Sequence, residues 1–104
     1  MQFYWYLRAA SQGHTAAMEM LANMYEKGDA VEKNKSIADK WYKKLFEIYS
    51  KQATEGNHQG QYNLGRLYEL GNGVSLDLEK AKYWYREAAK QGDEWAKWRL
   101  DELK

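Results

Sequence analysis

The stretch that decides the fold is a phrase that occurs twice almost in full. Tyr83–Gly92 reads YWYREAAKQG, and Tyr4–Gly13, 79 residues earlier, reads YWYLRAASQG. A third and shorter copy, KWYK, surrounds Trp41, which lies 36 residues after Trp5 and 43 residues before Trp84. Three copies of one phrase within 104 residues predict a protein built from internal repeats.

The segments between these phrases also align. LANMYEKG at Leu21–Gly28 matches LGRLYELG at Leu64–Gly71, 43 residues later. In both, apolar residues recur at steps of three and four, which is the period of a helix. Five glycines, at positions 13, 28, 56, 71 and 92, follow such stretches and are expected to end helices in the left-handed conformation. The pattern predicts an all-α fold, an α-solenoid of antiparallel helix pairs, with about six helices near residues 2–12, 15–27, 35–55, 58–70, 78–91 and 94–103.

Polar residues that can accept hydrogen bonds from a first helical turn stand before these helices. We expect Asn34 and Asp77 to cap the second helices of their repeats. Thr15, Asn57 or Asp93 can do the same for the first helices.

Short side chains recur at two equivalent sites. Ala22 and Gly65 share one site, and Ala38 and Ala81 share the other. A short side chain at both sites lets paired helices approach closely while Leu, Tyr and Trp fill the surrounding space. Leucine at Gly65 is therefore expected to overpack the contact and to cost roughly 1 to 3 kcal/mol.

The string Leu70–Gly92 resembles the Sel1-like repeat family. That family's pattern reads roughly G-x-G-V-x-x-D-x-x-K-A-x-x-W-Y-x-x-A-A-x-Q-G after a helix with L-G-x-x-Y, and the resemblance covers nearly the whole chain. It implies an α-solenoid related to tetratricopeptide repeats, and scaffolding or adaptor binding of other proteins rather than catalysis. We expect one repeat domain over 1–104, with a partial repeat at 1–13, repeats at 14–56 and 57–92, and a partial repeat at 93–104.

The first complete repeat departs from this pattern. Ala30 stands where the second repeat has Gly73, so if Gly73 needs a positive φ, Ala30 is strained or its turn differs. Asn34 likewise replaces Asp77. The second helix of the first complete repeat is extended by seven residues, which shifts its phase by only ~20°. We therefore expect a straight, overlong helix rather than a loop.

The chain opens with a second-type helix and closes with a first-type helix. Apolar residues there lack an evident cover, because a solenoid unit buries its apolar face against neighbours. They are Phe3, Tyr4, Trp5, Trp95, Trp98, Leu100 and Leu103. Three alternatives are open: the chain is a piece of a longer array, its ends form a homo-oligomer through the uncovered helices, or the terminal helices fold back.

Composition argues against several classes of function. A net charge of +1 provides no field for nucleic acid or for an anionic membrane, and no apolar run is long enough to span a bilayer. No secretory signal is visible in residues 1–8, and the compartment is not indicated. The absence of cysteine removes thiol chemistry, and His14 and His58 lack a third ligand at metal spacing. We expect no enzyme, no catalytic residue, no metal and no cofactor.

The candidate partner-binding residues lie on the first helices. By resemblance to the groove of tetratricopeptide-type proteins, they would line the concave face and bind a protein or peptide. They are Glu19, Asn23 and Glu26 in the first complete repeat, Tyr62, Arg66 and Glu69 in the second, and Trp98 and Glu102 in the last helix. Tyr62, Arg66 and Trp98 are the expected anchors.

Three alternatives to partner binding stay open. These side chains can form an ordinary solvated face, and the chain can be an architectural slice of a longer solenoid with no ligand of its own. A hydrolase or penicillin-binding activity, which has been associated with cysteine-rich Sel1-like relatives, is the third alternative.

Overall fold

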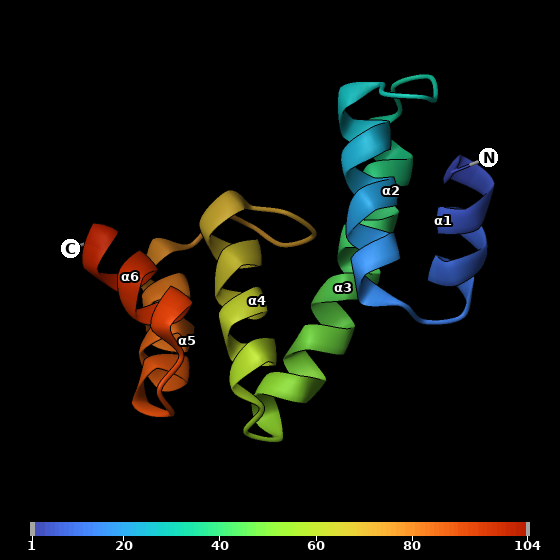
Figure 1. Cartoon of the computed structure of the whole chain (residues 1–104). Helices are drawn as coiled ribbons and strands as arrows, with labels where there is room; N and C mark the ends of the chain where they lie inside the picture. Colours follow the sequence, from blue (N-terminus) through green and yellow to red (C-terminus); the bar gives the residue numbers. More distant parts are fainter. Residues whose placement is uncertain (1, 104) are drawn as a thin grey trace. The chain divides into compact units, whose positions relative to one another are not determined.

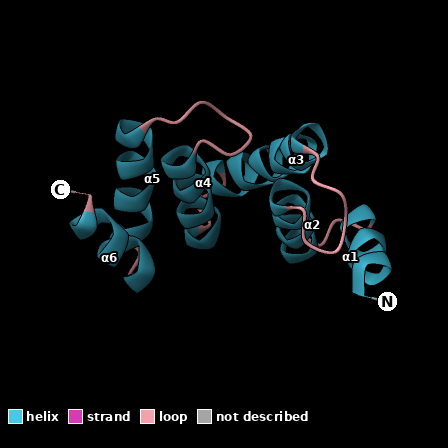
Figure 2. Ribbon diagram, turned by 90° about the horizontal axis from the view of Figure 1, so that it is seen from above, coloured by secondary structure: helices cyan, strands magenta, loops and turns pink. Residues whose placement is uncertain are grey.

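The computed structural model describes residues 2–103, and these form six α-helices and no strand (Figure 1). The helices are α1 (Gln2–Ser11), α2 (Thr15–Lys27), α3 (Lys35–Thr54), α4 (His58–Leu70), α5 (Leu78–Lys90) and α6 (Glu94–Glu102). They are joined only by turns and loops (Figure 2). All six predicted helices are confirmed, and no predicted boundary is more than one residue from the observed one.

The predicted signals at the helix ends are mostly confirmed. All five glycines expected to end helices have φ between 70° and 92°. The side chains of Asn34, Asn57, Asp77 and Asp93 each accept a hydrogen bond from a backbone N–H of the first turn. The expectation for Thr15 is wrong, because Thr15 is the first residue of α2 and the capping position is His14, whose side chain makes no capping hydrogen bond. His14 has no short side-chain oxygen to offer to those amides.

Packing divides the chain into two compact units, Met1–Leu45 and Phe46–Lys104. In unit 1, α1 and α2 form an antiparallel hairpin (Figure 1). The core of unit 1 contains Leu21, Ala22 and Leu45, all fully buried. Leu45 belongs to the first part of α3, so this helix contributes to the unit as well.

Unit 2 contains the rest of α3 with α4, α5 and α6. Its core centres on Ala81, Tyr85, Ala88 and Ala96, each 0% exposed. Tyr62, Tyr68, Ala89, Leu100 and Leu103 pack around this cluster and are partly buried. The expectation that Leu100 and Leu103 lack a cover is therefore wrong, because α6 turns these two side chains toward α5.

The predicted close helix contact at the small residues is confirmed. Ala22 and Ala81 are completely buried, and Ala38 is 1% exposed. A Cβ atom at Gly65 would lie 2.8 Å from Cε1 of Tyr85, closer than real Cβ atoms approach. Glycine at this position lets the Tyr85 ring lie directly on the backbone of α4.

The two departures of the first complete repeat have different structural outcomes. The seven extra residues are helical, since α3 runs from Lys35 to Thr54 without interruption. Ala30 adopts φ 67°, close to the φ of 73° at Gly73, so both turns share one shape. An alanine in this left-handed region carries strain that glycine avoids.

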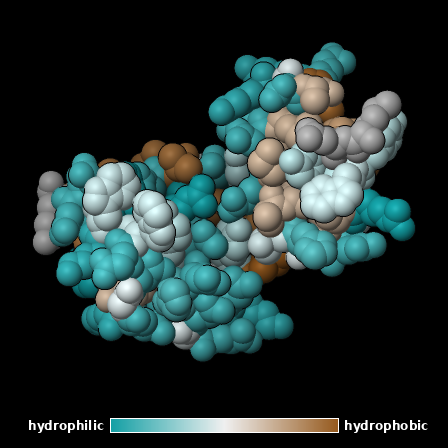
Figure 3. All heavy atoms as spheres, in the orientation of Figure 1, coloured by the Kyte–Doolittle hydropathy of each residue, from teal (hydrophilic) through white to brown (hydrophobic). Residues whose placement is uncertain are grey.

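The surface is largely polar. The face drawn in Figure 3 is mostly hydrophilic, with small pale and brown areas between the teal atoms. Large apolar side chains that remain exposed include Tyr4, Trp5, Met20, Trp95 and Trp98. None of the helices within residues 2–103 combines the length and the apolar character that crossing a bilayer requires.

Candidate protein-interaction surface

Each complete repeat joins its two helices by a bond between a tyrosine and a glutamate. The hydroxyl of Tyr42 in α3 donates to Oε1 of Glu26 in α2 at 3.5 Å, and that of Tyr85 in α5 donates to Oε1 of Glu69 in α4 at 2.7 Å. Burial raises the pKa of Tyr85, and the Glu69 carboxylate raises this pKa further. Both glutamates were candidate partner-binding residues, and their carboxylates are already engaged within the chain.

Arg99 extends this contact from one repeat to the next. Its guanidinium, in α6, forms an ion pair with Glu69 and donates from Nε to Oε1 at 3.2 Å. The hydrogen bond to Glu69 raises the pKa of Arg99. The same guanidinium lies 5.4 Å from the ring centroid of Trp98, within the range of a cation–π contact. Glu69 therefore receives donors from two repeats and fixes α6 against α4.

Tyr62 and Arg66 lie on the other side of the same tyrosine. The ring centroid of Tyr62 is 5.7 Å from that of Tyr85, and the Arg66 guanidinium lies 6.0 Å from the Tyr62 centroid. One chain of contacts therefore runs through Arg66, Tyr62, Tyr85, Glu69, Arg99 and Trp98. We call these six residues the aromatic–arginine network. The structure brings together all four candidate residues that were predicted for unit 2.

The other candidate residues stand apart from this network. Glu19, Asn23 and Glu26 lie on α2 in unit 1; Asn23 is exposed, and the two glutamates are half-buried. Glu102, at the end of α6, is exposed.

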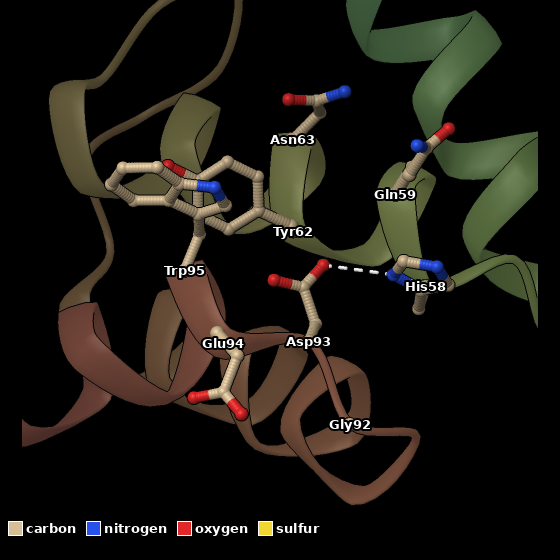
Figure 4. Close-up of a pocket in the computed structure, with 8 residues that line it drawn as sticks. All are labelled: His58, Gln59, Tyr62, Asn63, Gly92, Asp93, Glu94 and Trp95. Atoms are coloured by element: carbon tan, nitrogen blue, oxygen red, sulfur yellow. Dashed lines mark hydrogen bonds and ion pairs between the residues drawn. The ribbon is translucent and has the colours of Figure 1, made fainter.

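An open hollow of about 520 Å³ adjoins Tyr62 (Figure 4). It lies between the first half of α4 and the start of α6, and its lining residues are His58, Gln59, Tyr62, Asn63, Gly92, Asp93, Glu94 and Trp95. Nδ1 of His58 is 2.9 Å from Oδ2 of Asp93, whose other oxygen caps α6 through the Ala96 amide. The hollow thus has one fixed polar edge and the exposed indole of Trp95.

The chemistry of this surface is that of contact rather than of a metal centre. Within residues 2–103, no three or more His, Asp or Glu side chains are grouped so that they could hold a metal ion. The surface presents two aromatic side chains that are more than half exposed, Trp95 at 68% and Trp98 at 53%. Both are held on one short helix, which suits the recognition of another polypeptide.

Several residues of this surface were not among the predicted candidates: His58, Tyr85, Asp93, Trp95 and Arg99. A sequence signal existed for one of them. Glu26 and Tyr42 are separated by 16 residues, and Glu69 and Tyr85 have the same separation, so a pair conserved between the repeats was visible. Arg99 has no such counterpart, since Asn63 occupies its position in the preceding first-type helix.

Comparisons with known proteins agree on the fold. The sequence profile of the Sel1 repeat matches residues 3–14, 15–47 and 58–93, which is well over half of the chain. No curated protein matched in a sequence search. The chain is similar to solved helical-repeat structures, which supports the predicted α-solenoid class.

Two of these structures share more than 30% sequence identity with this chain. A Sel1 repeat protein from Oxalobacter formigenes is 39% identical, with a TM-score of 0.56; the match covers 95% of this chain and 69% of that one. The protective antigen c5321 from uropathogenic Escherichia coli, which displays an SLR fold, is 35% identical, with a TM-score of 0.54 over 94% of this chain. This chain spans only 20% of the length of c5321.

A third structure, cysteine-rich protein B from Helicobacter pylori, is 24% identical and supports the fold alone. The match covers 90% of this chain and 65% of that one, with a TM-score of 0.52. Sel1-like repeat proteins generally act as non-enzymatic scaffolds for other proteins. The repeated Trp-Tyr phrase, the six helices and the profile matches together place this chain in the Sel1 repeat family.

Proposed function

We propose that this chain is a protein-binding module and that unit 2 binds a partner polypeptide through the aromatic–arginine network and the adjoining hollow. The observation that carries the proposal is the exposure of Trp95 and Trp98 beside Tyr62. Large aromatic side chains on a rigid helix gain contact area at low conformational cost, and they dominate the energetics of many interfaces.

The contacts inside the network support this proposal because they order the surface before a partner arrives. Arg99 is held by Glu69, and its guanidinium lies against the Trp98 ring, so neither group has to be immobilised fully on binding. Ordering a long side chain at an interface costs about 0.5 to 1.5 kcal/mol, so this preorganisation favours affinity.

The lining of the hollow indicates the kind of segment it would accept. The rings of Tyr62 and Trp95 offer an apolar contact, and Glu94 adds an exposed carboxylate beside them. A partner segment with an aromatic or aliphatic anchor followed by a basic residue fits this combination.

Site-specific photo-crosslinking tests the proposal and identifies the partner. A benzophenone amino acid is introduced at Trp98 or at Tyr62 in the full chain, in cells that naturally make the protein. The matched control carries the same amino acid at Tyr83, which is 49% exposed on α5 and lies outside the network.

We expect one protein to be crosslinked from positions 98 and 62 but not from position 83. The purified partner should then lose at least tenfold in affinity for Trp95→Ala or Arg66→Ala, a size typical of interface anchors. Equal crosslinking from Tyr83, or unchanged affinity for both variants, contradicts the proposal.

A further inference from the structure

A groove between α1 and α2 exposes apolar surface of a kind that is buried in unit 2. A hollow of about 390 Å³ is lined by Trp5, Tyr6, Ala9, His14, Ala16, Ala17 and Met20. We call it the α1–α2 groove. Trp5 is 64% exposed and Met20 is 41% exposed, so its walls are open to solvent.

The internal repeat shows what kind of element covers such a surface. A single offset of 79 residues maps α1 and α2 onto α5 and α6. Tyr85, Ala88 and Ala96 are the counterparts of Tyr6, Ala9 and Ala17, and all three are fully buried. Helix α4 contributes to their burial, since Tyr62 packs on this cluster and the backbone at Gly65 lies against the Tyr85 ring. The α1–α2 groove therefore has the shape of a seat for a helix like α4.

The hydroxyl of Tyr6 indicates a polar contact that such a helix would make. Its counterparts Tyr42 and Tyr85 each donate a hydrogen bond to a glutamate of the helix that packs on them. The Tyr6 hydroxyl makes no hydrogen bond to any residue within the described part of the chain. A glutamate placed one turn after the small residue, as Glu69 is placed after Gly65, would complete this bond.

Charge narrows the choice of helix further. A second hollow, of about 320 Å³, continues the groove along Arg8, Gln12 and His14. Neither hollow is lined by an acidic side chain. At the positions equivalent to Arg8 and His14, unit 2 has Glu87 and Asp93. The rim of the groove is thus basic where the rim in unit 2 is acidic, so it favours an acidic occupant.

We propose that the α1–α2 groove binds an acidic amphipathic helix of another protein. This helix places Gly or Ala over the Tyr6 ring and a glutamate within reach of the Tyr6 hydroxyl. A second copy of this chain fits poorly, because Asp101 of α6 stands where α4 has Gly65. The surface lies in unit 1, so this proposal does not depend on the partner site in unit 2.

A peptide with the sequence of residues 57–72 serves as the probe, since it contains the helix that covers the equivalent surface. Its binding to the full chain is measured by fluorescence anisotropy. Tyr6→Phe in the protein should weaken binding about three- to tenfold, the effect of one hydrogen bond to a carboxylate. Tyr4→Phe is the matched control, because Tyr4 is exposed on α1 and does not line the groove.

Peptide variants separate the predicted contacts. Gly65→Leu in the peptide should weaken binding at least tenfold by overpacking the Tyr6 ring. Once Glu69→Ala is present in the peptide, Tyr6→Phe in the protein should cause no further loss. His58→Glu in the peptide should strengthen binding at low salt, and Arg8→Gln in the protein should remove that gain.

Four results would overturn the proposal. They are no binding of the parent peptide at millimolar concentration, equal binding of its Gly65→Leu variant, equal effects of Tyr6→Phe and Tyr4→Phe, and self-association that Met20→Glu abolishes. The last result would show that a second copy occupies the groove. Circular dichroism and thermal midpoints of each protein variant establish that a lost signal is not lost folding.

Discussion

The hydroxyl of Tyr85 donates a 2.7 Å hydrogen bond to Oε1 of Glu69, and this bond joins the two helices of one repeat. Tyr85 is completely buried, and only 16% of the Glu69 side chain is exposed. A carboxylate at such a position requires donors, and Tyr85 and Arg99 supply them. Glu69 is therefore part of the structural framework of the repeat, whether or not a partner also contacts it.

Removal of the Tyr85 hydroxyl should lower stability measurably. We expect Tyr85→Phe to reduce the free energy of unfolding by about 1 to 2 kcal/mol, because the lost hydrogen bond is to a charged group. Urea denaturation checks this value. Tyr83→Phe on the exposed side of α5 is the control and should change stability by less than about 0.5 kcal/mol. Equal effects of the two substitutions would refute a special role for this bond.

The raised pKa of Tyr85 predicts a loss of stability in alkali. Below about pH 10, tyrosine is protonated in both the folded and the unfolded state, so the stabilisation is complete. Above that pH the unfolded chain loses this proton while the folded chain keeps it, so unfolding becomes easier by up to about 1.4 kcal/mol per pH unit. Urea titrations between about pH 9 and about pH 11 should give a steeper fall for the parent than for Tyr85→Phe. Parallel curves would contradict the assignment.

A side chain at Gly65 should destabilise the hairpin of α4 and α5. Gly65→Leu is expected to cost roughly 1 to 3 kcal/mol, because its Cβ alone would lie 2.8 Å from the Tyr85 ring. Gly65→Ala should cost less, since the gain in helix propensity offsets part of the clash. Leucine and glycine variants with the same midpoint in urea would show that the helices can separate freely at this contact.

Exchange of residues between the two equivalent turns should have opposite effects. Ala30→Gly is expected to stabilise the chain by about 0.5 to 1 kcal/mol, because glycine adopts φ 67° without strain. Gly73→Ala should destabilise it by a similar amount for the converse reason. Thermal unfolding measures both, and Ala16→Gly, at an exposed position in α2, should be destabilising. A loss of stability in Ala30→Gly would mean that the turn tolerates alanine.

Asp93 combines two roles that can be separated by substitution. Asp93→Ala should cost about 1 to 2 kcal/mol, because it removes both the cap of α6 and the contact with His58. Asp77→Ala removes a cap alone and should cost about 1 kcal/mol. Urea denaturation compares the two variants, and Asp93→Asn should retain most of the cap. If Asp93→Ala costs no more than Asp77→Ala, the His58 contact contributes nothing measurable.

The helices were predictable because their ends are marked locally. Gly28 and Gly71 end α2 and α4 in the left-handed conformation, and Asn57 and Asp77 begin α4 and α5 with side-chain caps. Each of these effects depends on neighbouring residues in the sequence. The missed cap at His14 has the same explanation in reverse, since a helix can begin without a side-chain cap when water satisfies its first amides.

The candidate surface was only partly predictable. Tyr62, Arg66 and Trp98 follow from the register of the repeats, but the contacts that connect them depend on Arg99, which reaches 30 residues back to Glu69. Such a contact has no periodic signal. The choice of Glu26 and Glu69 as binding residues overlooked their identity in both repeats, which is more typical of packing than of variable recognition. Whether any of these side chains contacts a partner stays a prediction.

The tyrosine–glutamate bond has a consequence for how such chains can lengthen. Glu26 and Tyr42 belong to one repeat, and Glu69 and Tyr85 belong to the next, so each fastening opens and closes inside a single copy. A gene segment that encodes one copy can therefore be duplicated, deleted or transplanted with its own fastening intact. Only the ion pair from Arg99 crosses a boundary, which leaves the junctions between copies free to diverge.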